Sequence, residues 1–301
     1  MKLSTDFTLS KFFSSEKLVA YYELTKPGIT LTVVISMVVG FVLGSGSSID
    51  YLLLLQAAIG TTLIAAGTAA HNQFMEWRLD GKMKRTQQRP LPSSKITPEE
   101  SMVFSISLIF SGLLYLMLAV NVVAGIASLA TTVLYLFAYT PLKRVSAVNI
   151  VIGAIPGALP VVGGWAAATG QLDNIGVWLL FGIVFFWQIP HVIAIAWVCK
   201  DDYQHAGFHM LPANDPKAIK TVSFILLCLL MLLPITWALY TTGLTGILFL
   251  SGALLSSLVF LGYGLAFAWK KTKDAAKKLM FASFAYLPVI WFFAMLDQLI
   301  H

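Results

Sequence analysis

The chain has 301 residues, of which 58% are hydrophobic and only 11% are charged, and its mean hydropathy is +0.81. These values exclude a water-soluble globular domain and indicate an all-α polytopic membrane protein. The formal net charge is +6. Its basic residues are not interleaved with aromatic ones on a common face, so the charge does not indicate a nucleic-acid partner.

Nine apolar segments follow one another along the chain, at residues 28–45, 51–71, 101–119, 122–140, 147–168, 176–198, 221–241, 244–268 and 279–299. Each is about long enough to cross a hydrocarbon core of about 30 Å. We therefore expect residues 28–301 to form nine transmembrane helices in the lipid bilayer. Residues 1–27 lack the uninterrupted apolar stretch of a signal peptide, so we expect them to form a cytoplasmic N-terminal segment.

Positive charge is distributed asymmetrically between the loops. All 20 Lys and Arg residues fall in the N-terminal segment or after the second, fourth, sixth and eighth apolar segments. Because cytoplasmic loops of membrane proteins are enriched in Lys and Arg, the N-terminus and these loops are expected in the cytoplasm, and the C-terminus outside.

A polar stretch follows the second apolar segment. Asn72, Glu76 and Asp80 are spaced by four residues, so they advance only about 40° per step on a helix and share one face. Four cations follow Asp80 within nine residues: Lys82, Lys84, Arg85 and Arg89. Carboxylates beside cations suit a magnesium–diphosphate site, in which oxygens hold the metal and basic groups bind phosphate. For the basic residues alone, an ordinary juxtamembrane loop is an equal alternative.

The sixth apolar segment contains the polar residues Gln188 and His191, with Pro190 expected to kink the helix. His191 and Asp202 are eleven residues apart on nearly the same helix face, about 16 Å along the axis. We expect His191 deep in a cytoplasm-facing cavity, with Asp202 at its mouth opposite the first acidic cluster. The alternative is a buried histidine that a neighbouring helix satisfies.

These motifs together resemble the UbiA superfamily of intramembrane prenyltransferases, and within it the branch that farnesylates haem. The resemblance covers most of the chain and is carried by Asn72-xxx-Glu76-xxx-Asp80, Arg85-Thr86-xx-Arg89-Pro90, Trp187-Gln188-xx-His191, Asp202-Tyr203, Met210-Leu211-Pro212, Leu24-Thr25-Lys26-Pro27 and Tyr139-Thr140-Pro141-Leu142-Lys143-Arg144. Two positions depart from the superfamily pattern: Val198 replaces an acid of the second motif, and Glu76 replaces an aspartate of the first.

The resemblance implies a UbiA-like helix bundle in a bacterial plasma (inner) membrane. It also implies transfer of a farnesyl group from farnesyl diphosphate to a vinyl group of haem B, with addition of water, to give haem O for haem–copper oxidases. A haem A synthase would be a candidate partner. The implied magnesium ligands are Asn72, Glu76, Asp80 and Asp202. Substrate binding would fall to Lys84, Arg85, Arg89, Lys143, Arg144 and Tyr203, and His191 is the candidate base.

Two other functions stay open. A prenyltransferase that acts on an aromatic quinone precursor would use the same diphosphate chemistry. A transporter would also combine broken helices, repeated halves and a buried histidine, although the ionisable residues here gather at one membrane face. The fifth apolar segment is rich in small or helix-breaking residues, which permit close helix packing or line a cavity: Gly153, Pro156, Gly157, Pro160, Gly163 and Gly164.

Overall fold

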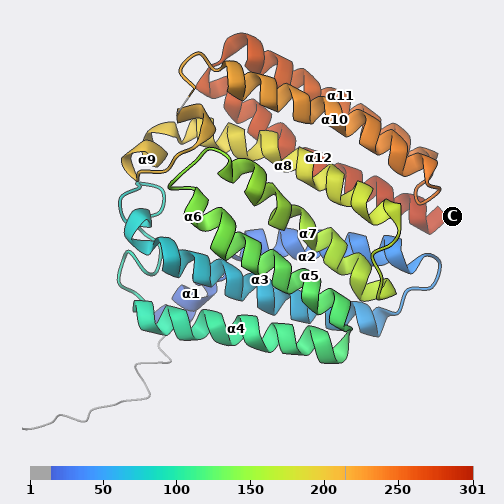
Figure 1. Ribbon diagram of the computed structural model, residues 1–301, viewed down its shortest axis with the longest axis horizontal. Coiled ribbons are helices and arrows are strands. Elements are labelled where there is room, and N and C mark those ends of the chain that lie inside the picture. The colour runs from blue at the N-terminus through green and yellow to red at the C-terminus, as the bar shows by residue number, and fades with distance from the viewer. Residues whose placement is uncertain (1–14, 214, 301) are drawn as a thin grey trace, which may run out of the picture.

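The computed structural model describes residues 15–213 and 215–300, and every regular element within these ranges is helical. Nine of the described helices are long and apolar enough to cross a membrane, which confirms the predicted multi-pass membrane protein. They are α2 (Pro27–Ser45), α3 (Tyr51–Asp80), α4 (Pro98–Ala119), α5 with its continuation (Val122–Leu142), α7 (Asn149–Thr169), α8 (Ile175–Val198), α10 (Ile219–Thr241), α11 (Ile247–Lys270) and α12 (Lys273–Ile300). They form a bundle of roughly aligned helices (Figure 1).

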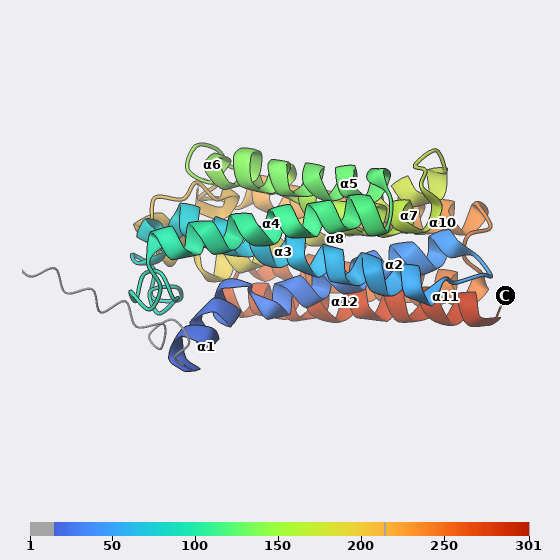
Figure 2. The ribbon, with the colours of Figure 1, turned by 90° about the horizontal axis from the view of Figure 1, so that it is seen from below.

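Shorter elements complete the chain at one end of the bundle. They are α1 (Ser15–Leu24), the π-helix η2 (Leu134–Tyr139) and α6 (Thr140–Leu142), which continue α5, α9 (Lys200–His205), and the 3₁₀ turn η3 (Leu211–Ala213). Figure 2 shows α1 projecting from this end of the bundle. Most predicted helix ends lie within three residues of the observed ones. The exceptions are α3, which continues nine residues beyond its apolar segment and so includes the polar face to Asp80, and α12, which begins six residues earlier than its apolar segment.

Local sequence signals explain where several helices begin. The Asp50 side chain accepts a hydrogen bond from the Leu53 amide at the start of α3, and the Asn121 side chain accepts one from Ala124 at the start of α5. Thr97 and Glu100 form a capping box before α4. Each contact satisfies a backbone amide that the first helical turn leaves without a partner.

The packing of α2 against α7 depends on two glycines. A Cβ atom on Gly40 would lie 1.9 Å from the Val161 carbonyl oxygen of α7, and one on Gly164 would lie 1.8 Å from the Met37 carbonyl oxygen of α2. The two backbones therefore approach each other more closely than any larger residue permits. Helix α7 also packs against α5 and α8, so it links the two halves of the bundle.

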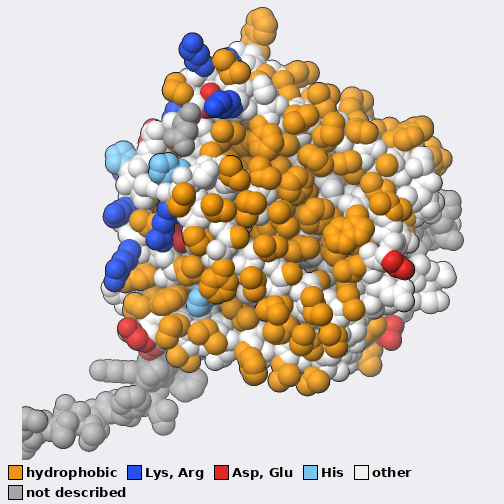
Figure 3. Space-filling model, viewed as in Figure 1, with side chains coloured by type: hydrophobic (Ala, Val, Ile, Leu, Met, Phe, Trp, Pro, Cys, Tyr) orange, Lys and Arg blue, Asp and Glu red, His pale blue; other side chains and the backbone are white. Residues whose placement is uncertain are grey.

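Apolar and basic side chains occupy different parts of the surface along the direction of the helix axes. Figure 3 shows an apolar surface across the middle of the bundle, with Lys and Arg side chains gathered at the end where α9 lies. This arrangement agrees with the charge asymmetry between the predicted loops.

Candidate active site

The last three turns of α3 carry a buried polar face. Asn72, Glu76 and Asp80 are only 1%, 4% and 2% exposed, and all three line one cavity at the charged end of the bundle. The predicted shared face is therefore present, because the helix extends to Asp80. A buried amide and two buried carboxylates require polar partners, which other segments of the chain supply.

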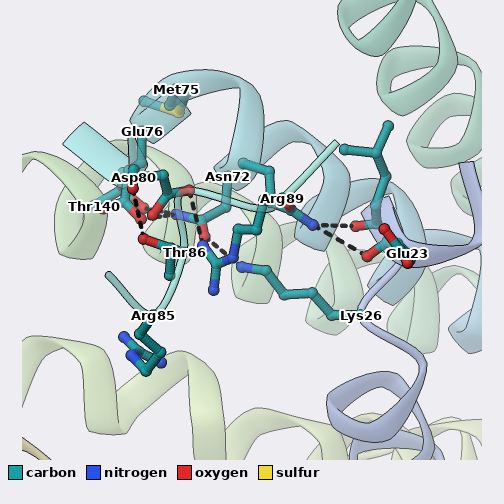
Figure 4. A network of polar contacts seen from close by, with 12 residues as sticks. Glu23, Lys26, Asn72, Met75, Glu76, Asp80, Arg85, Thr86, Arg89 and Thr140 are labelled. Carbon is teal, nitrogen blue, oxygen red and sulfur yellow. Dashed lines mark hydrogen bonds and ion pairs between the residues drawn. The ribbon is translucent and has the colours of Figure 1, made fainter. Parts of the chain in front are cut away.

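Each of these three side chains has a cation from a different segment against one of its oxygens. The Lys26 ammonium, between α1 and α2, donates to Asn72 Oδ1 at 2.8 Å. Lys143, just after α6, donates to Glu76 Oε1 at 2.9 Å. Arg89, in the loop after α3, donates to Asp80 Oδ2 at 2.8 Å. Figure 4 shows the Lys26 and Arg89 contacts converging on the α3 face.

The Asn72 amide joins this face to the π-helix η2. Its Nδ2 donates to Glu76 Oε2 and to Thr140 Oγ1, both at 3.1 Å. The Thr140 hydroxyl in turn donates to the Tyr135 carbonyl oxygen at 2.8 Å, within the widened turn. These bonds fix which way the amide points, so Oδ1 is directed at Lys26. Short π-helical segments are frequent at functional sites.

The loop after α3 is anchored by a buried threonine. The Thr86 hydroxyl donates to the Asp80 carbonyl oxygen at 2.8 Å, and the neighbouring Met83 side chain is packed in the core. The anchor places Arg85 and Arg89 over the cavity, which both residues line. This explains the Arg-Thr-xx-Arg-Pro sequence: the threonine holds the loop, and the two arginines lie at the rim of the cavity, with Arg85 exposed and Arg89 partly buried.

The second sequence segment closes the cavity from α9 and the loop after it. Tyr203, Phe208 and Met210 line the cavity, and the Tyr203 hydroxyl accepts a hydrogen bond from Arg85 at 3.4 Å. The His209 amide donates to the Lys143 carbonyl oxygen at 2.7 Å, so this loop is attached to the segment that carries the lysine.

The polar cavity has a volume of about 90 Å³. Its lining contains two carboxylates, Glu76 and Asp80, and four basic side chains, Lys26, Arg85, Arg89 and Lys143, so the lining is positive and attracts anions. Burial lowers the pKa of Lys26 to about 7, and the nearby positive charge of Arg89 lowers this pKa as well.

A second cavity of about 270 Å³, largely apolar, lies next to the polar one. Lys26, Tyr135 and Tyr139 line both cavities and mark their junction. Five of the six small or breaking residues of α7 line the apolar cavity, namely Gly153, Pro156, Gly157, Pro160 and Gly163, whereas Gly164 packs on α2. Both expected uses of these residues therefore occur.

The structure brings most of the predicted site residues together. Asn72, Glu76, Asp80, Arg85, Arg89, Lys143 and Tyr203 line the polar cavity. Four predicted residues do not line either cavity. Lys84 is exposed, Asp202 is partly exposed at α9, and Arg144 donates to the Met75 carbonyl oxygen at 3.1 Å. The ring of His191 forms a hydrogen bond with Ser283 of α12 at 2.7 Å and stacks on Trp187.

Lys26, Tyr135 and Tyr139 are cavity residues to which the sequence interpretation gave no role. Lys26 directly precedes Pro27 and has a left-handed backbone, with φ of 47°, at the point where α1 turns into α2. A non-glycine residue in this conformation is uncommon. By charge asymmetry alone a lysine beside an apolar segment is a topology signal, whereas the structure places the Lys26 ammonium group in the cavity against Asn72.

The donor set on α3 fits a magnesium ion in its chemistry. Asn72, Glu76 and Asp80 offer three hard oxygen ligands on one buried face. Only two of them are carboxylates, and within residues 15–213 and 215–300 no group of three His, Cys, Asp or Glu side chains is arranged to hold a metal. A magnesium ion at this face would therefore need further oxygen ligands.

Comparison with known proteins agrees with this architecture. The UbiA prenyltransferase family profile matches residues 33–287. A protein of Solibacter usitatus called protoheme IX farnesyltransferase is 41% identical over 92% of this chain and 98% of its own. A protein of the same name from Cytophaga hutchinsonii is 38% identical over 93% of this chain and 98% of its own.

Solved structures share the fold at low sequence identity. A digeranylgeranylglyceryl phosphate synthase superposes with a TM-score of 0.80 at 20% identity, covering 95% of this chain and 100% of its own. A UbiA homologue from Archaeoglobus fulgidus, bound to GPP and Mg²⁺, superposes with a TM-score of 0.67 at 15% identity, covering 93% and 99%. The family match and the relatives' identity over nearly the whole chain show that the protein belongs to the UbiA prenyltransferase family.

Proposed function

We propose that this protein transfers the farnesyl group of farnesyl diphosphate to a vinyl group of haem B, with addition of water, and so forms haem O and diphosphate. The observation that carries the proposal is the pair of adjoining cavities. One is lined by four basic side chains and the α3 oxygens, and the other is largely apolar. A prenyl diphosphate has the same division into a charged head and an apolar chain. The names of the relatives support haem as the acceptor.

The polar cavity is suited to assisting loss of the diphosphate. Arg85, Arg89 and Lys143 donate hydrogen bonds to oxygens and would stabilise the negative charge that develops as the allylic C–O bond breaks. Magnesium, held by Asn72, Glu76 and Asp80, would add Lewis-acid stabilisation of the same leaving group. Asp202, which does not line this cavity, is proposed as a further ligand only on the superfamily pattern.

In this proposal, C1 of the farnesyl group lies at the junction between the two cavities. The terminal carbon of the haem vinyl group forms a bond to C1 of the farnesyl cation, and the positive charge moves to the vinyl carbon next to the macrocycle. Water adds there and releases one proton. Tyr135 and Tyr139 present aromatic rings at this junction, and aromatic faces stabilise nearby cations.

The orientation in the membrane belongs to the same proposal. The polar cavity lies at the end of the bundle that carries the Lys and Arg residues, so we place its opening on the cytoplasmic side. Farnesyl diphosphate would bring its charged head to that face while its chain enters the bundle.

The test supplies membranes that contain the protein with farnesyl diphosphate and either haem B or 4-hydroxybenzoate, followed by mass analysis of the products. We expect a farnesylated, hydrated haem and no prenylated benzoate. Membranes without the protein are the control. Prenylation of the benzoate alone would replace haem by a quinone precursor as acceptor, and no prenylated product from either acceptor would contradict the proposal.

A further inference from the structure

The oxygens proposed to hold magnesium already have positive partners within the protein. Lys26, Lys143 and Arg89 contact Asn72, Glu76 and Asp80 at 2.8, 2.9 and 2.8 Å. These oxygens are almost completely buried, so bulk water contributes little to balancing their charge. A metal ion that binds these side chains therefore competes with the three cations, most directly at Glu76, where Lys143 contacts both carboxylate oxygens.

Displacement by a free metal ion is electrostatically unfavourable. The cavity lining has two more basic side chains than carboxylates, and a divalent ion would add to this excess at distances of a few ångströms. The displaced Lys143 ammonium, whose side chain is only 14% exposed, would also lose its partner, which is costly for a largely buried charge.

A diphosphate in the cavity both neutralises the excess positive charge and offers the displaced cations new partners. A diphosphate monoester carries about three negative charges near neutral pH, which exceed the positive excess of the lining. Its oxygens also offer Lys26, Arg89 and Lys143 new partners within the same cavity. The side chains of Arg89 and Lys143 are long and unbranched, so they can turn from carboxylate to phosphate without movement of the helices.

We propose that the site takes magnesium and prenyl diphosphate as one unit and has little affinity for the free metal. Lys26, Arg89 and Lys143 act as internal counterions that pass from the α3 side chains to the diphosphate, and the released oxygens then bind the metal. This exchange rests on the proposed function, and it couples the two ligands: each increases the affinity for the other by the same factor.

The experiment measures metal binding directly. Mn²⁺ is titrated into the purified full-length protein in detergent, with free Mn²⁺ followed by electron paramagnetic resonance. The titration is made with and without farnesyl thiodiphosphate, a slowly reacting analogue. For the wild type we expect the analogue to strengthen Mn²⁺ binding at least about tenfold.

Removal of one of these basic side chains should increase the affinity for Mn²⁺, whereas removal of a metal-binding oxygen should decrease it. In Lys143→Met the Glu76 carboxylate loses its cation, so we expect Mn²⁺ alone to bind about tenfold more tightly than to the wild type, with a smaller gain from the analogue. Lys95→Met is the matched control, because Lys95 has the same charge but is exposed and lies outside the cavity lining. Its Mn²⁺ affinity should equal that of the wild type.

Two results would overturn the exchange: Mn²⁺ binding to the wild type that is equally tight with and without the analogue, or no gain in affinity for Mn²⁺ alone in Lys143→Met. If Lys143→Met does not fold, Arg89→Gln frees Asp80 in the same way and carries the test. The proposed function is judged separately by product formation in the wild type. An active enzyme with an intrinsic, analogue-independent metal site would refute the exchange alone.

Discussion

Replacement of Asp80 by asparagine tests the α3 site with the smallest change in shape. The side chain is 2% exposed and its Oδ2 lies 2.8 Å from Arg89 Nη1. At an effective dielectric constant of about 20, this separation corresponds to a Coulomb attraction of roughly 6 kcal/mol. Desolvation of the carboxylate offsets most of that value, and the 27% exposed arginine can turn to solvent. We therefore expect a net loss of about 1–2 kcal/mol in unfolding free energy.

The effect of Asp80→Asn on turnover should be larger than its effect on stability. The substitution removes one of the two α3 carboxylates proposed to hold magnesium, and it leaves Arg89 without its ionic partner. Loss of one charge-stabilising group in an active site typically costs about 10²–10³-fold in rate. Haem O formation, followed by mass, and thermal unfolding in detergent measure the two effects. Asp274→Asn, an exposed aspartate at the start of α12, is the control. A folded Asp80→Asn protein with nearly normal turnover would refute the assignment.

Three further predictions concern packing, orientation and the second acidic cluster. Gly164→Ala should lower the free energy of unfolding by at least about 2 kcal/mol, because its Cβ would meet a backbone carbonyl of α2. Gly28→Ala, whose Cβ would meet nothing within 4 Å, should not lower it. Equal melting temperatures for the two variants would contradict the close contact. A reporter fused to the C-terminal end should be active only outside the cytoplasm, and one inserted near Lys95 only inside; activity on the opposite sides would reverse the orientation. Asp202→Asn should reduce turnover more than Asp201→Asn, and equal, mild losses would remove Asp202 from the metal site.

The apolar segments predicted the fold well because a membrane-spanning helix leaves a direct signal in composition. Helix α3 continues beyond its apolar segment, as the predicted shared face of Asn72, Glu76 and Asp80 requires. The apolar run stops at residue 71, but the helix continues to Asp80. The polar side chains of this extension are nearly buried and have Lys26, Lys143 and Arg89 as partners. A hydropathy pattern shows where the chain becomes polar, but it does not show which distant residues will contact these polar side chains.

The partners themselves could not be predicted from spacing along the chain. Asn72 and Lys26 are separated by 46 residues, and Glu76 and Lys143 by 67. Their contacts depend on how α2, α3 and α6 pack. Helix periodicity placed the three α3 side chains on one face because that relation is local. The cations come from three other segments, and only the tertiary structure identifies which basic residue faces which oxygen.

His191 is a second residue whose tertiary contacts could not be predicted from the sequence. The sequence predicted a histidine deep in the cavity, but its ring contacts Ser283 and Phe284 of α12, while Gln188, one turn earlier, lines the apolar cavity. If His191 nevertheless acts on the haem side of the reaction, His191→Ala should cut haem O formation at least about tenfold and leave the affinity for farnesyl thiodiphosphate unchanged. Ser283→Ala is the discriminating variant, because it removes only the hydrogen bond that holds the ring. A packing histidine would give lower melting temperatures in both variants with turnover preserved, and that result would leave Gln188 as the polar side chain of α8 that faces the substrate.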